Sequence, residues 1–229
     1  MVARLNSELP SILDMSAACS FLFDTTVQII STHSQVHDLA LDFNRLPFNA
    51  TFYSIDSPYN LPVHERYSFH KGVHKLWVFS SDKPLYRGSH TFPRCEIAID
   101  GYKYTKGIWQ FEGYIFVPQG TTRVGVMQIF GADPPVATTM MLHVYNGDLY
   151  YYRHTVVIRN IYNKWIRLNV IHDVEGNDVE VYINGDLKFK GNGRGGTTHY
   201  FKCGVYAEGR KSGYMESRWR DIKVFRKFS

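Results

Sequence analysis

The sequence predicts an all-β protein, an antiparallel two-sheet β-sandwich of the jelly-roll type with a cleft over its concave face. Three observations carry this prediction. From Phe48 onward, apolar and polar residues alternate with the two-residue period of half-buried strands. Two Asn-Gly pairs mark tight hairpins, and no segment after Phe48 has the period of an amphipathic helix. About ten short strands separated by turn signals are typical of a sandwich.

Each expected element rests on its own alternation or turn. The first strand alternates around Leu76 and Val78, and a later one around Trp109 and Phe111. The pairs Asn146-Gly147 and Asn184-Gly185 place hairpin tips, because this dipeptide adopts the positive-φ turn that suits strand twist. The expected strands and hairpins cover residues 68–81, 94–99, 107–118, 122–132, 138–154, 165–174, 177–191, 200–209 and 221–228.

The chain divides into residues 1–45 and residues 46–229. The first part is acidic, poor in tyrosine and without two-residue alternation. We expect it to be peripheral and partly disordered, or to form a short helix over residues 10–23. Its start is a poor signal peptide, and none is predicted. The second part is the expected β-domain.

Composition and charge limit the classes of partner that the protein can have. Hydrophobic residues make up 44% and charged residues 21%, as in a folded globular protein. The net charge is +5, although residues 1–50 hold two basic against five acidic residues. The basic body favours a polyanionic partner, such as an acidic polysaccharide, nucleic acid or an anionic surface, unless the lysines only solvate the outer faces. No Lys/Arg-rich helix suggests nucleic acid, no apolar run is long enough for a membrane span, and we expect a monomer.

Cysteines and histidines give no sign of a disulfide framework or a metal site. Cys95 and Cys203 occupy inward strand positions, where a buried free thiol is expected. His70 and His74 have i,i+4 spacing, but no third ligand accompanies them, so no metal is expected. The glycine-rich stretch at residues 191–196 lacks the features of a phosphate loop and is expected to be a flexible lip between strands. Asn49 begins one glycosylation sequon.

Three strands place unusual polar residues on their solvent-facing side. One carries Arg94 and Glu96, and a second carries Gln128. If the three strands share a sheet, these side chains form one concave floor, which is a candidate binding site. The third strand carries Lys202, Tyr206 and Glu208 on that side, with Tyr200 at its start.

These residue types suit proton abstraction next to a uronate carboxylate, with loss of the oxygen at the β carbon. Arginine, glutamine and lysine can neutralise the carboxylate as charge builds on it. A histidine or tyrosine can take the proton, and a tyrosine can protonate the leaving oxygen. Neither a cofactor nor a nucleophile is needed. Structural readings stay open: Arg94 and Glu96 as an ion pair, Tyr206 as a core aromatic, and Lys202 as a solvated cation.

The same strands resemble a known family. "PRCEIAI", "MQIFG" and "YFKCGVYAEG" resemble three strand motifs of alginate-lyase-like jelly rolls. "SPYNLPVHERYSF", "GVHKLWVFSSDKP", "MLHVYNGDLYYYR" and "YMESRWRDIKV" are similar to plant citrate-binding proteins and glucuronan lyases. The resemblance covers about residues 43–226. It implies a jelly roll with a cleft, and a secreted, apoplastic or vacuolar location.

The resemblance also implies roles for particular residues. Gln128 would hold the carboxylate, His90 would be the base or neutraliser, and Tyr206 the acid or base. Arg94, Glu96, Lys202, Phe130, Tyr200 and Glu208 would contact the substrate.

Three positions depart from the lyase pattern. Phe130 stands where the pattern has histidine, Ala98 where it has a second arginine, and Glu208 where it has glutamine. Ala98 and Glu208 should weaken uronate binding, since one removes a cation and the other adds an anion.

Three functions therefore remain open. The first is a polysaccharide-lyase-like enzyme acting on a uronic-acid-type substrate. The second is a non-catalytic binder of citrate or cell-wall glycans, which Ala98 and Phe130 favour. The third is the same scaffold recruited for elimination, cyclisation or isomerisation of a small molecule.

Overall fold

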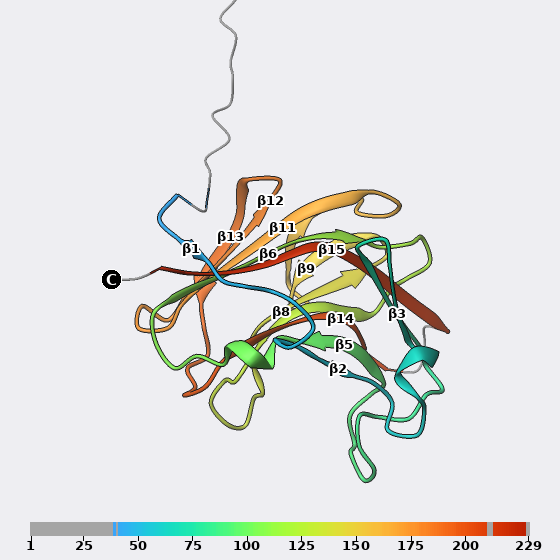
Figure 1. Cartoon of the computed structure of the whole chain (residues 1–229). Helices are drawn as coiled ribbons and strands as arrows, with labels where there is room; N and C mark the ends of the chain where they lie inside the picture. The colour runs from blue at the N-terminus through green and yellow to red at the C-terminus, as the bar shows by residue number, and fades with distance from the viewer. Residues whose placement is uncertain (1–38, 40, 210–212, 228–229) are drawn as a thin grey trace, which may run out of the picture. The chain divides into compact units, whose positions relative to one another are not determined.

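The computed structural model describes residues 39, 41–209 and 213–227. These residues form fifteen strands and two single-turn 3-10 helices, Val63–Glu65 and Asp100–Tyr102. All the strands belong to two antiparallel sheets, which lie one above the other in Figure 1. The predicted all-β sandwich is therefore confirmed, with more strands than the sequence suggested because several are only two to four residues long.

Sheet A holds eight strands and contains the long C-terminal strand, which pairs with three neighbours (Figure 1). Its order is β13 (Asp186–Asn192), β12 (Asp178–Ile183), β11 (Trp165–Asp173), β6 (Ile108–Phe116), β15 (Tyr214–Lys227), β4 (Val73–Phe79) and β3 (Tyr67–His70), with β1 (Asn44–Arg45) beside β15.

Sheet B holds seven strands and carries the predicted polar face. Its order is β10 (Thr155–Ile158), β9 (Asp148–Tyr151), β8 (Thr138–Tyr145), β7 (Val124–Phe130), β14 (Tyr200–Ala207), β5 (Arg94–Ala98) and β2 (Ser54–Asp56).

The peripheral segment predicted for residues 1–45 lies mostly outside the described residues, as does the helix predicted over residues 10–23. Its last two residues form β1, which pairs with Arg226 and Phe225 of β15. The β-domain therefore begins slightly before residue 46.

Both predicted Asn-Gly hairpins are present. Asn146 and Gly147 join β8 to β9 with φ values of 50° and 89°. Asn184 and Gly185 join β12 to β13 with φ values of 53° and 95°. Positive φ at both central residues gives the turn whose twist matches that of the two strands.

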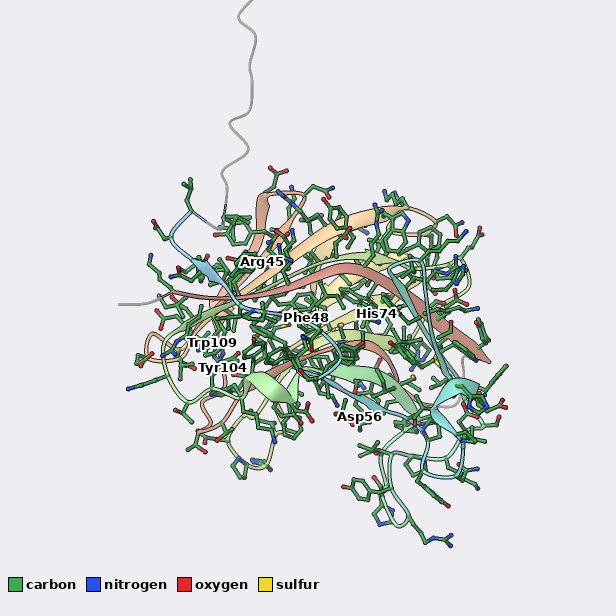
Figure 2. All side chains as sticks on the ribbon, in the orientation of Figure 1. Arg45, Phe48, Asp56, His74, Tyr104 and Trp109 are labelled. Carbon is green, nitrogen blue, oxygen red and sulfur yellow. The ribbon has the colours of Figure 1, made fainter. Side chains whose placement is uncertain are left out.

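The core lies between the sheets, where the inward residues of alternating strands meet. Tyr104 stacks on Trp109 with ring centroids 4.6 Å apart (Figure 2). The Tyr104 hydroxyl also lies 3.0 Å from Nδ1 of His172, which satisfies a polar group that the core encloses. Cys95 and Cys203 are free and fully buried, as predicted, and burial raises the pKa of both thiols.

A short chain of hydrogen bonds joins the two sheets at Ser217. The Ser217 hydroxyl of β15 donates to the carbonyl of Gly204 in β14 at 2.7 Å, and the Trp219 indole donates to Ser217 at 3.0 Å. Gly204 lies where the register between β14 and β7 shifts, so its carbonyl is available to sheet A. With a φ of 151°, Gly204 also brings β14 close to β5, because a Cβ there would lie 2.3 Å from the Cys95 carbonyl oxygen.

Within the described part of the chain, no helix has the length and apolar character needed to cross a membrane.

Replacing Gly204 with alanine should destabilise the fold strongly. The added methyl group would collide with the β5 backbone, so we expect a loss of about 3 kcal/mol in the free energy of unfolding. Gly213→Ala is the control, because a Cβ there meets no atom within 4 Å. Urea denaturation of both variants measures the difference. Equal stability of the two would show that β14 and β5 are not held together through this residue.

Candidate functional site

Sheet B brings the three polar strands together, as the sequence predicted. β14 lies between β5 and β7, with Tyr206 opposite Arg94 and Lys202 opposite both Ala98 and Gln128. Because side chains of paired residues point to the same face, the polar residues share one surface.

Glu96 is the centre of this surface, although only 1% of it is exposed. One carboxylate oxygen accepts a hydrogen bond from the Gln128 amide nitrogen at 2.6 Å. The other lies 2.8 Å from Nζ of Lys202 and 3.7 Å from a terminal nitrogen of Arg94. The Glu96 carboxylate therefore joins β5, β14 and β7 through side chains.

Lys202 has a second anionic partner. Its Nζ lies 2.5 Å from a carboxylate oxygen of Asp56, which belongs to the edge strand β2 and is labelled below Phe48 in Figure 2. Burial lowers the pKa of Lys202, but the attraction of Glu96 and Asp56 outweighs burial and raises it above its ordinary value. Lys202 is thus a charged, buried group, and the reading of it as a solvated cation is wrong.

These five residues form a closed polar cluster, defined here as Asp56, Arg94, Glu96, Gln128 and Lys202. Two cations face two anions, so the cluster is balanced in charge. A substrate carboxylate would have to compete with Glu96 for the very donors that a lyase would use.

Beside the closed polar cluster, sheet B carries an open cleft with a cavity volume of about 570 Å³. Half-buried Tyr206 lies between the two, because the Arg94 guanidinium stacks 3.8 Å from its ring centroid while Tyr206 also lines the cleft. The cleft is lined by Phe92, Met141, His143, Tyr151, Tyr152, Arg153, His154, Thr155, Arg194, Tyr206, Ala207 and Glu208.

Glu208 lies on the wall of the cleft and is already paired. It accepts hydrogen bonds from the Tyr145 hydroxyl and from Nε of Arg153. Burial, followed by the bond to Glu208, raises the pKa of Tyr145. The negative charge that Glu208 adds to the lyase pattern is therefore neutralised by Arg153.

His143 lies in the cleft, 6% exposed, and its Nδ1 has no hydrogen-bond partner among the described residues. Burial lowers the pKa of His143 below its ordinary value, against the opposing effect of Glu208. Sequence reasoning assigned this segment only to a hairpin. The signal was present, since Met141, His143 and Tyr145 alternate with Met140, Leu142 and Val144, which face the core between the sheets.

The glycine-rich stretch predicted as a flexible lip closes one side of the cleft through Arg194. Backbone groups hold it: Gly193 donates to the Asn177 carbonyl at 2.7 Å, and the Arg194 carbonyl accepts from Asp133 at 3.1 Å. The Arg194 backbone also donates to the Thr139 hydroxyl at 2.6 Å. The Arg194 guanidinium stacks 3.7 Å from the Tyr152 ring centroid, which leaves a cation at the cleft wall.

The other predicted site residues lie apart from this cleft. His90 is exposed and lines a separate pocket with Lys83 and Asp82, which meets the cleft only through Phe92. Phe130 and Tyr200 pack together with ring centroids 5.2 Å apart at the far end of the polar face. The structure therefore joins Gln128 to Arg94, Glu96 and Lys202, and leaves His90 outside.

No three His, Cys, Asp or Glu side chains of the described residues are grouped as metal ligands would be. His70 is exposed, whereas His74 is buried with its Nδ1 2.9 Å from the Tyr67 hydroxyl.

A sequence model of alginate lyases matches residues 46–226. The chain belongs to the alginate lyase family. It is 46% identical to a citrate-binding protein of Hevea brasiliensis over 210 residues, which is 91% of this chain and 88% of the relative.

Solved structures agree on the fold. Alginate lyase AlgAT5 from polysaccharide lyase family 7 superposes with a TM-score of 0.61 at 18% identity, covering 76% of this chain and 94% of that one. A substrate complex of the family 7 alginate lyase A1-II' gives 0.60 at 13% identity, covering 80% and 96%. The chain thus has a polysaccharide-lyase-like jelly-roll scaffold.

Replacing Glu96 with glutamine should destabilise the protein by about 3 kcal/mol, because it leaves two buried cations with Asp56 as their one remaining anion. Asp186→Asn is the control, since its pair with Lys188 is exposed and contributes about 0.5 kcal/mol or less. Thermal and urea unfolding measure both variants. A Glu96→Gln protein as stable as the control would contradict the central role of this carboxylate.

Proposed function

We propose that the cleft of sheet B binds a carboxylate-bearing sugar or small acid and removes a β-oxygen from it by elimination. Membership of the alginate lyase family and the shared scaffold support this class of reaction. The observation that carries the proposal is the position of Tyr206, held by Arg94 on one side and lining the cleft on the other. The fold alone would not support the proposed elimination, since one fold can have many functions.

The reaction has simple requirements. A base removes the proton next to the carboxylate, the released electron pair forms a carbon–carbon double bond, and the β-oxygen leaves. The Tyr206 hydroxyl protonates that oxygen, which makes it a better leaving group. The Arg94 guanidinium fixes the orientation of the Tyr206 ring, so the hydroxyl does not have to be positioned during the reaction.

The charges of the site favour a ligand with few carboxylates. The closed polar cluster has no excess cation, and Ala98 supplies none opposite Lys202. The cations at the cleft are Arg153, which Glu208 neutralises, and Arg194. Phe92, Met141 and Tyr151 add apolar surface to the wall. Such a site suits an acid that presents one carboxylate and a ring or apolar face.

Two roles that the family pattern implies change in this proposal. Gln128 would hold Glu96 in place rather than contact the ligand, because it is 2% exposed. His90 would belong to the neighbouring pocket, which meets the cleft at Phe92, rather than to the reaction centre.

Tyr206→Phe should lower the rate of elimination about 100-fold or more, because the leaving oxygen loses its proton donor. Glucuronan, alginate and pectate are the first substrates, and the far-ultraviolet absorbance of the unsaturated product measures the rate. Tyr86→Phe is the matched control, since Tyr86 is 62% exposed and lines none of the cleft. Unchanged turnover in Tyr206→Phe would remove Tyr206 from the mechanism.

A second candidate is carboxylate binding without turnover. The bond between Glu96 and Gln128 favours it, since the amide that would hold a substrate carboxylate is already occupied. The name of the Hevea brasiliensis relative, citrate-binding protein, is consistent with it.

Citrate binding should then give a measurable heat of binding. Arg194→Ala should weaken the affinity for citrate about tenfold or more, because the cleft loses its unneutralised cation. Isothermal titration calorimetry measures both. Lys188→Ala, which removes a cation from the β12–β13 hairpin, controls for net charge. Absence of heat with citrate and with acidic oligosaccharides alike would count against binding.

A further inference from the structure

The outer face of sheet A, which points away from the core, carries arginines among aromatic rings. They come from β15, β6 and β11, which lie side by side in Figure 1. The strand register pairs these residues with one another, and paired residues share a face. Their neighbours Ile115, Ile166 and Trp219 fill the core instead. We call the outward set the arginine platform: Tyr114, Phe116, Trp165, Arg167, Arg218 and Arg220.

Aromatic rings hold two of these guanidinium groups in place. The guanidinium carbon of Arg218 lies 5.2 Å from the centroid of the Phe116 ring. That of Arg220 lies 5.1 Å from the Tyr114 centroid and 4.7 Å from the Trp165 centroid. The side chains of Arg218 and Arg220 are nevertheless 41% and 42% exposed. Stacking uses the face of a guanidinium and leaves N–H groups at its edge, so the platform presents donors that are already positioned.

The positive charge around β15 exceeds the negative charge that faces it. One carboxylate, that of Glu216, serves both Arg218 at 2.6 Å and Lys75 at 3.1 Å. The carboxylate of Asp221 lies 3.9 Å from Nε of Arg220, and its side chain is 59% exposed. So distant and exposed a pair neutralises little charge. Most of the charge of Arg220 therefore remains available to a ligand.

Arg167 adds a further cation on the neighbouring side of β6. The carboxylate that it acts on, Glu112, already binds Nζ of Lys223 at 2.5 Å and the Asn169 amide at 2.9 Å. Burial opposes ionisation of Glu112, but Lys223 and Asn169, with a smaller effect of Arg167, hold its pKa below the ordinary value. Because Glu112 has these closer partners, the charge of Arg167 also remains available.

These donors suit several carboxylates on one long chain. A guanidinium edge binds a carboxylate through two parallel hydrogen bonds, which a lysine cannot do. An exposed pair of this kind contributes only about 1 kcal/mol or less, so a polymer that contacts several arginines binds far better than a single acid. Along β15, the Cα atoms of Arg218 and Arg220 are about 7 Å apart, and Arg167 is about 10 Å away across β6. One polymer chain can therefore reach all three.

The stacked guanidinium groups make single-stranded nucleic acid a poorer partner. Sheets that bind single strands stack the bases on open aromatic faces. In the platform, guanidinium groups lie over the rings of Tyr114, Phe116 and Trp165. A base would have to displace an arginine to reach a ring, whereas a carboxylate binds the arginine where it lies.

We propose that the arginine platform binds an acidic polysaccharide, a polyuronate with a carboxylate on each sugar. This surface lies on the opposite face of the sandwich from the cleft of sheet B. It would hold the protein on the polymer, while the cleft stays open to a ligand of its own. The inference goes beyond the proposed elimination and does not depend on it.

Binding of the full chain to immobilised polygalacturonate tests the platform. All measurements use the Tyr206→Phe background, so that elimination in the cleft does not degrade the polymer. The double variant Arg167→Gln/Arg220→Gln should weaken the affinity about tenfold or more, because two unneutralised cations are lost. The matched control is Arg87→Gln/Lys188→Gln, which removes the same charge at exposed positions outside the platform. Equal affinities of the double variant and the control would overturn the inference.

A second double variant, Arg167→Lys/Arg220→Lys, keeps the charge and removes the planar groups. It should recover the affinity only in part, because lysine cannot replace the guanidinium that stacks on Trp165. Urea unfolding shows which variants are folded. If the glutamine variant does not fold, the lysine variant decides, and wild-type affinity in it would overturn the role of the stacked arginines.

Two further comparisons identify the surface and the partner. Arg194→Ala, in the cleft, should weaken polymer binding less than the platform variant does, and a larger loss in Arg194→Ala would place the polymer in the cleft. Single-stranded DNA should bind more weakly than polygalacturonate at equal ionic strength, and neutral dextran should not bind. DNA that binds as tightly through the same arginines would overturn the polysaccharide as partner, and dextran binding would overturn recognition by charge.

The outcomes also separate this inference from the proposed function. If no uronic substrate is converted by the wild type but polygalacturonate binding depends on the platform, elimination fails and the platform stands. If the wild type converts uronic substrates and the platform variant binds the polymer like its control, the platform fails and elimination stands.

Discussion

The buried carboxylate of Glu96 is the constraint around which sheet B is organised. A carboxylate that loses its water is costly unless donors surround it, and here the donors come from β5 itself, from the adjacent β14 and from β7 beyond it. Those donors fix the register of β5, β14 and β7, because a one-residue slip would turn Lys202 or Gln128 to the other face. Gly204, opposite Glu96, lets the two backbones approach.

This arrangement divides one face of the sheet into two regions with different chemistry. The closed polar cluster has its charges matched internally, so it orders the sheet and holds Tyr206 through Arg94. The cleft beside it has aromatic walls, the Arg194 guanidinium and a histidine with a free nitrogen. Tyr206 belongs to both regions. The residues that resemble the lyase motifs thus support the site, while much of the surface open to a ligand comes from β8, β9 and the lip.

Much of the fold could be predicted because it depends on local patterns. Strand alternation, the Asn-Gly turns and the inward thiols of Cys95 and Cys203 each follow from residues close in sequence. The polar face was also predictable, since strand parity assigns Arg94, Glu96 and Gln128 to one side. The sequence did not show which of these residues lie next to each other in space. That His143 and Tyr206 line the same cleft depends on which strands pair and where their registers shift, and residue periodicity shows neither. Asp56 was missed because β2 has three residues, too few to show alternation. The exposed position of His90 depends on the path of a loop.

The hydrogen bonds that hold the lip involve its backbone, so the shape of the cleft does not depend on the side chain that gives the lip its charge. Its backbone is tied to Asn177, Asp133 and Thr139 through main-chain groups, and the guanidinium of Arg194 takes no part in those bonds. Substitution of Arg194 would keep the backbone of the cleft wall in place, but it would change the charge of the wall and remove the stacking on Tyr152. A scaffold built this way can acquire a new ligand by point substitution, without the loop insertions or backbone shifts that usually accompany a change of specificity.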